Sequence, residues 1–170
     1  IYQRIVERAA AEYEEPDPIN WDHEIIGRNN TTAQANAFLA WLEGDAAAAA
    51  KARDFLLRMP TDFESNTTWD VNIRMPHVLM TYCYAYDLLR AMGGLSKEEA
   101  EQAERIVTEV TGKFFGKYLD NPVFRQIALG VSQNNHPIRT ASAIGLVAIA
   151  LPDHPDAAEW ANWAVSELAY

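Results

Sequence analysis

The sequence has one cysteine, few basic residues and no long hydrophobic run. Cys83 cannot form an internal disulfide, and because it lies in an apolar helical stretch we expect a small buried side chain. The longest apolar run, residues 141–151, is too short to cross a bilayer, so no membrane partner is expected. With 14 basic and 24 acidic side chains, the formal net charge is -10. This charge argues against a nucleic-acid partner, because nucleic-acid-binding proteins present a basic face.

Several sequence motifs for chemistry are also missing. The 4 histidines and Cys83 show no metal-ligand spacing, so no metal site is predicted. There is no glycine-rich phosphate loop and no Gly-x-Ser-x-Gly elbow, and no cofactor is predicted. No pair of carboxylates indicates glycoside hydrolysis. The chain begins without methionine in one helical pattern and ends in or just after another. We therefore expect residues 1–170 to form a single helical domain that is an incomplete piece of a larger one.

Helical periodicity runs along the whole chain, and strand-like alternation is absent. A first helix is predicted over 1–13 and a loop over 14–28. Mostly apolar helices are then predicted at 31–42, 73–92 and 138–151, alternating with one-faced helices at 46–58, 96–112 and 155–169. The apolar helices should be buried and the one-faced helices should cover them. The expected buried face of the last helix contains Ala158, Ala161, Val165 and Leu168.

Short turns join each apolar helix to the next one-faced helix, which predicts antiparallel hairpins. Ser96 and Glu99 form a capping box at one such turn. Ala52 and Leu56 have counterparts in Ala164 and Leu168, a weak echo that favours stacked repeats. The predicted fold is all-α, with stacked antiparallel helical hairpins forming part of an (α/α) toroid. An α-solenoid also fits this pattern.

The starts of the three apolar helices carry the candidate site. In stacked hairpins these helices run parallel, so their N-termini gather at one end and favour an anionic ligand. The residues of interest near these starts are Arg28, Trp69, Asn72, Arg74, His77, Asn134, Asn135, His136 and Arg139. Pro137 is expected at the first helical position, behind the polar residues Asn134, Asn135 and His136. We therefore expect one anion-binding rim on an otherwise acidic protein.

Structural roles compete with this interpretation. Asn135 is a favoured helix cap, and Arg74 and His77 are also consistent with a solvated helix end. Trp69 lies in a loop, where an aromatic ring is free to stack on a sugar. Four other aromatic residues are expected to pack against neighbouring helices: Tyr82, Tyr86, Trp160 and Trp163. Two histidines, His23 and His154, are expected to lie at the surface.

The run from Asn134 to Arg139, followed by an apolar helix of small residues, resembles the heparinase II/III-like and alginate-lyase group of polysaccharide lyases. A second likeness is Tyr-Asp-Leu-Leu at 86–89 with the Leu-Ser-x-Glu-Glu turn at 95–99. The resemblance covers most of residues 30–170. It implies an N-terminal α/α toroid, a C-terminal β-sandwich absent from this sequence, and a periplasmic or secreted protein. The chain departs from the family pattern at Pro137, where related enzymes often carry glycine.

The resemblance also implies an activity, which is cleavage of uronate-containing polysaccharides by β-elimination. Asn135 and His136 would neutralise the uronate carboxylate, and Arg74, His77, Arg139, Trp69, Asn134 and Asn72 would line subsites. The tyrosine that serves as base and acid in this family is expected beyond residue 170. The fragment alone should be inactive, because the missing remainder of its own chain supplies the other wall of the cleft. Two alternatives remain open: a non-catalytic helical scaffold that binds carbohydrate or protein, and another α/α-toroid enzyme such as a glycosidase.

Overall fold

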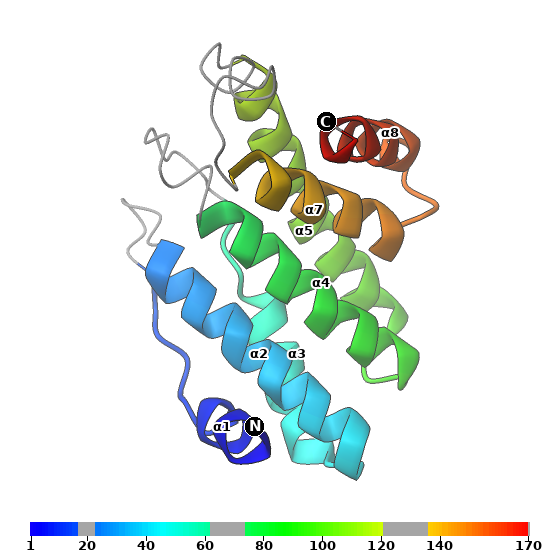
Figure 1. The fold of residues 1–170 in the computed structure, drawn as a ribbon. Coiled ribbons are helices and arrows are strands. Elements are labelled where there is room, and N and C mark those ends of the chain that lie inside the picture. The colour runs from blue at the N-terminus through cyan, green and yellow to red at the C-terminus, as the bar shows by residue number, and fades with distance from the viewer. Residues whose placement is uncertain (17–22, 62–73, 121–135, 170) are drawn as a thin grey trace.

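The structure, a computed structural model, describes residues 1–16, 23–61, 74–120 and 136–169, and these residues contain helices and no strand. One layer is formed by α2 (His23–Glu43), α4 (Met75–Ala91) and α7 (His136–Ala150). A second layer is formed by α3 (Ala46–Leu57), α5 (Lys97–Asp120) and α8 (Ala157–Leu168). The short helix α1 (Tyr2–Ala9) packs on α2 (Figure 1). The all-α prediction is confirmed.

Each helix of the first layer is followed along the chain by its partner in the second, and short turns reverse the chain. α2 is followed directly by Gly44, whose φ of 70° is the left-handed conformation that glycine adopts without strain. Asp45 then caps α3, because its side chain accepts hydrogen bonds from the N–H groups of Ala47 and Ala48 at 2.8 and 3.1 Å. Before α5, the Ser96 N–H donates to Glu99 Oε2 at 2.8 Å and the Glu99 N–H donates to Ser96 Oγ at 3.2 Å. The predicted capping box is confirmed.

The hydrophobic core lies between the two layers, around α4, which packs against both α2 and α7 (Figure 1). Tyr82 and Tyr86 are fully buried, as predicted for packing residues. Their hydroxyls donate to the Ala103 carbonyl at 3.0 Å and to Glu104 Oε1 at 2.5 Å, so α5 satisfies both polar groups. Cys83 is also buried, as expected. Within the described residues, no helix combines the length and the apolar character needed to cross a membrane.

Several helix boundaries differ from the sequence prediction. α1 ends at Ala9, α5 continues to Asp120, and α7 starts at His136, so Pro137 is its second residue. α2 starts at His23, inside the predicted loop 14–28. Its first turns are helical because they pack: a Cβ on Gly27 would lie 3.6 Å from His77 Cδ2 of α4. Tertiary contact here outweighs the loop signals of the preceding Pro and Asp residues.

The predicted buried face of α8 is wrong. Ala157, Trp160 and Ala164 are buried, whereas Val165 and Leu168 are 67% and 50% exposed. Alanine-rich helices present apolar residues on more than one face, and the buried face of α8 is the one that packs against its neighbours, α7 above all. Trp160 lies on that face, and its ring stacks on His154 at 4.7 Å. His154 is therefore a packing residue rather than the plain surface histidine that we expected.

The expectation that α7 is buried all round is also wrong, since Ile138 and Ile149 are 56% and 75% exposed. Ala143, Ile144 and Val147 form its buried face. The packing role predicted for Trp163 is confirmed by an edge-on contact with Phe115, whose ring centroid lies 5.2 Å away.

Candidate anion-binding site

The N-terminal ends of α2, α4 and α7 lie at the same end of the molecule (Figure 1). A cavity of about 410 Å³ lies where they meet. It is lined by Arg8, Glu24, Gly27, Arg28, Thr31, Arg74, His77 and Arg139. The parallel helices α2, α4 and α7 thus contribute residues near their starts to one place, and Arg8 joins them from the last turn of α1.

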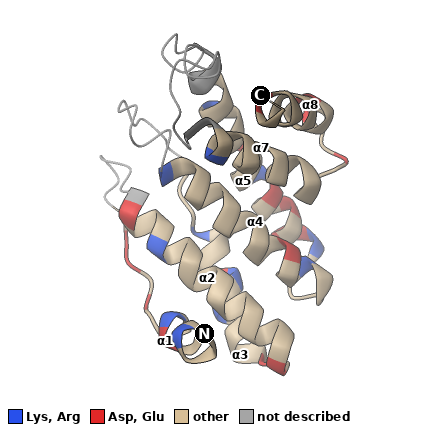
Figure 2. Cartoon of the chain, in the orientation of Figure 1, with Lys and Arg blue, Asp and Glu red and all other residues tan. Residues whose placement is uncertain are grey.

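Local sequence places the cations of this cavity near helix starts. Arg74 is the N-cap residue of α4, directly before Met75 and Pro76. Arg139 lies three residues after the start of α7, and Arg28 lies in the second turn of α2. Helix N-termini carry partial positive charge, so these guanidinium groups add to a field that already favours an anion. Figure 2 shows the basic residues near the starts of these three helices.

Two of the four arginines are paired with carboxylates. Arg28 makes a bidentate contact with Glu14, with Nε and Nη2 at 2.9 and 2.8 Å, and this contact lowers the pKa of Glu14. Arg74 Nη2 lies 2.8 Å from Glu24 Oε1. Within the described part of the chain, Arg8 and Arg139 form no ion pair, which leaves a local excess of positive charge on the cavity wall.

His77 contributes a neutral imidazole to the cavity. Partial burial, and secondarily the charge of Arg139, lower its pKa, so the ring is uncharged at neutral pH. Thr31 Oγ1 donates its proton to the Gly27 carbonyl at 2.6 Å. His77 Nε2, 3.3 Å from the same oxygen, is therefore the N–H donor.

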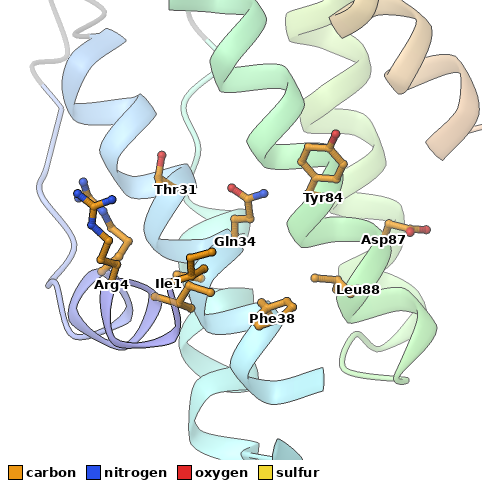
Figure 3. A pocket seen from close by; sticks show the side chains of 11 residues that line it. Ile1, Arg4, Thr31, Gln34, Phe38, Tyr84, Asp87 and Leu88 are labelled. Carbon is orange, nitrogen blue, oxygen red and sulfur yellow. The ribbon is translucent and has the colours of Figure 1, made fainter. Parts of the chain in front are cut away.

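A second cavity, of about 650 Å³, adjoins the first and shares Arg8 and Thr31 with it. Its wall is mostly apolar and comes from α1, α2 and α4 (Figure 3). The residues that line it are Ile1, Arg4, Ile5, Arg8, Thr31, Gln34, Ala35, Phe38, Tyr84, Asp87 and Leu88. The two adjoining cavities are together called the groove: the smaller one is lined by four arginines, and the larger one has a mostly apolar wall.

The structure brings together Arg74, His77 and Arg139, which the sequence assigned to one site. His136 is the first residue of α7, so a helix start at this point is confirmed, but its side chain lies outside the described residues. Asn134, Asn135, Asn72 and Trp69 also lie outside the described residues. Their predicted roles remain predictions.

Sequence reasoning missed Arg8 and Glu24. Arg8 reaches the cavity because α1 packs on α2, and no local pattern indicates that contact. Glu24 was hidden by the predicted loop. The signal that points to it is the i, i+4 spacing of Glu24 and Arg28, which is typical of one helical face.

Comparison of the sequence with known families and curated proteins adds no assignment to this geometry. No model of a known protein family matches the chain, and no curated protein matches its sequence. In the described residues, no group of three or more His, Cys, Asp or Glu side chains is arranged to hold a metal ion. The chemistry of the site therefore follows from its arginines, its histidine and the helix N-termini.

Proposed function

We propose that this chain is part of an α/α-toroid polysaccharide lyase that cleaves uronate-containing glycans by β-elimination. The observation that supports it is the convergence of three helix starts on one arginine-lined cavity. An acidic protein with a net charge of -10 does not attract polyanions as a whole, so an acidic substrate needs a local site of this kind. The parallel α2, α4 and α7 would be the inner helices of the toroid.

The reaction makes a specific demand on such a site. A base takes the C5 proton of the uronate, the electron pair left on C5 forms the C4=C5 double bond as the C4–O bond breaks, and an acid gives a proton to the leaving oxygen. The negative charge that develops on the carboxylate must be stabilised by donors already in place. By the resemblance, Asn135 and His136 at the start of α7 supply these donors, and the base tyrosine belongs to a part of the protein beyond residue 170.

The cavity of about 410 Å³ with its four arginines (the arginine cavity) would bind the acidic sugar next to Asn135 and His136. Arg8 and Arg139 form no ion pair with a described carboxylate, so their charge is available to the carboxylate of the sugar, and His77 lines the same cavity beside Arg139. Asn72, Asn134 and Trp69 would complete the subsites. The remainder of the toroid and the β-sandwich are the partners that close the cleft, and a periplasmic or secreted location suits an enzyme that meets polysaccharides.

The test uses the longest natural chain that contains residues 1–170, incubated with alginate, heparan-type and other uronate polysaccharides. The unsaturated sugar end is followed by its ultraviolet absorbance. We expect a rise on one substrate, with His136→Ala lowering kcat by about 10²–10³-fold, as for loss of one charge-stabilising donor. Arg139→Gln should raise KM more than it lowers kcat, because it removes substrate binding.

The matched control is Arg105→Gln, which removes an exposed arginine of α5 that lines neither cavity. Its activity should equal that of the native protein. A flat absorbance trace with every polysaccharide, from a protein that is folded by circular dichroism, would contradict the lyase. Binding without cleavage would then favour the non-catalytic scaffold, and release of reducing ends without absorbance would favour a glycosidase.

A further inference from the structure

Hydrogen bonds to α2 hold the α1 wall of the larger cavity in place. Asn36 of α2 is buried, and its Nδ2 donates to the Ala9 carbonyl at the end of α1 at 3.0 Å. Asn29, also buried, accepts from the Glu14 N–H at 3.1 Å and donates to the Glu14 carbonyl at 2.7 Å. These bonds replace water around backbone groups that would otherwise be unpaired. They tie α1 and the segment after it to α2, so Arg4 and Arg8 stand on a positioned element.

The lining of this cavity combines an apolar floor with polar groups at its edges. Phe38, Leu88 and Ile5 supply apolar surface, and Tyr84 is 44% exposed. Figure 3 shows Gln34 and Phe38 on α2, between Arg4 of α1 and Tyr84 of α4. Asp87 lies one turn beyond Tyr84 on α4. A cavity with an apolar floor and hydrogen-bond donors and acceptors at its edges fits a ligand that has both an apolar face and polar groups.

We propose that this cavity is a subsite for a second sugar ring, linked to the acidic sugar in the arginine cavity. The apolar face of the ring packs on Tyr84 and the floor at Phe38, and its hydroxyls bond to Gln34 and Asp87. Arg4 and Arg8, one helical turn apart on α1, bind an acidic substituent of that ring. The choice of an acidic glycan as the ligand rests on the proposed function. What is added here is that the ligand extends over two or more sugars.

Charge and continuity favour this occupant. Five arginines line the groove, with Glu24 and Asp87 as the lining carboxylates and Glu14 paired with Arg28, on a protein with a net charge of -10. Arg8 and Thr31 line both cavities, so we expect a ligand of several linked sugars to contact both. The family resemblance applies to residues 30–170, and α1 precedes them. The cavity wall that α1 forms is therefore seen in the structure and is not implied by the resemblance.

The experiment measures binding of alginate and heparan-type oligosaccharides of one to four sugars to the same long natural chain, by isothermal titration calorimetry at fixed pH and ionic strength. We expect affinity to rise at least tenfold between one sugar and two, because the second ring occupies the larger cavity. Uncharged cello-oligosaccharides of equal length should bind more weakly at every length.

Variants separate the two cavities. Tyr84→Ala should weaken tetrasaccharide binding about tenfold, equivalent to ~1.4 kcal/mol, and leave the single sugar unchanged. Tyr84→Phe keeps the ring face and should retain most of the affinity. Arg4→Gln should act like Tyr84→Ala, while its control Arg105→Gln should have no effect.

The outcomes distinguish this inference from the proposed function. Length-dependent binding that Tyr84→Ala removes, together with a flat lyase assay, would support the subsite and contradict the lyase. Cleavage with no gain in affinity from one sugar to two, or with tetrasaccharide affinity unaffected by Tyr84→Ala and Arg4→Gln, would overturn the subsite and leave the lyase standing. Failure of every oligosaccharide to bind would overturn both.

Discussion

His77 is the residue that should make ligand affinity in the arginine cavity depend on pH. Its pKa is lowered by partial burial and by Arg139, so it is neutral where the arginines are charged. A bound anion offsets the charge of Arg139 and so favours the protonated ring. By linkage, anion binding is then accompanied by proton uptake at His77, and affinity depends on pH.

We therefore expect the affinity for an acidic sugar to increase as the pH falls from about 8 to about 5, a range in which carboxylates stay ionised. Calorimetry in two buffers of different ionisation enthalpy measures the proton uptake directly. His77→Gln keeps a polar side chain without a titratable group, and it should make both the affinity and the heat independent of pH. Equal affinity of the native protein at the two pH values would refute this role.

The residues of the site differ in how well the sequence predicts them. Arg74 and Arg139 were predictable because each lies near a helix start that a neighbouring proline marks, and His77 lies within the same turn as Arg74. Such signals are local and act within a few residues. Arg8 was not predictable, since its place depends on the hydrogen bond that Asn36, far along the chain, donates to the Ala9 carbonyl at the end of α1.

Among the helices, the α7–α8 pair depends on a close approach of two backbones. A Cβ added to Gly145 of α7 would lie 3.1 Å from the Cβ of Ala164 on α8. Small residues at both positions let the two helices pack at short distance, and Trp160 fills the space one turn before Ala164. This contact also explains why Ala157, Trp160 and Ala164, and not Val165 and Leu168, face the core.

Gly145→Leu should lower the free energy of unfolding by about 1–3 kcal/mol, because the larger side chain forces α7 and α8 apart. Urea denaturation followed by circular dichroism measures the change. The control is Gly112→Ala on α5, where an added Cβ meets no atom within 4 Å. That variant should stabilise the protein by about 0.5–1 kcal/mol through helix propensity alone. A neutral effect of Gly145→Leu would show that the two helices are free to separate.

Helix existence was easier to predict than helix faces or ends. The first two hairpin turns follow from local signals such as Gly44, Asp45 and Ser96, which act within a few residues. The face of α8 is decided by what packs against it. The start of α2 is likewise decided by the contact of Gly27 with α4. The periodicity of one helix contains no information about its neighbour.

For the molecule as a whole, α4 is the central element, and Cys83 reports on its burial. The side chain is 2% exposed, and burial raises the pKa of its thiol to about 12. Because α4 packs against both α2 and α7, solvent reaches Cys83 only when these contacts open.

A thiol reagent should therefore label Cys83 very slowly in the native protein at about pH 8, where a free cysteine of ordinary pKa reacts readily. In increasing urea, the labelling rate should follow the unfolded fraction seen by circular dichroism, because both report the same opening. Since the chain has one cysteine, no second thiol contributes to the signal. Labelling that precedes the circular dichroism transition would indicate that α4 opens locally.

The sequence by itself determined that the chain is helical, where most hairpins turn, and which polar residues stand at the helix starts. These properties depend on neighbours within one or two turns, so local chemistry encodes them. Only the tertiary structure decided that α1 supplies Arg4 and Arg8 to the groove, that Glu24 pairs with Arg74, and which face of α8 is buried. These features arise from contacts between residues distant in the chain, where packing and desolvation of the whole set of helices select among faces that look alike in sequence.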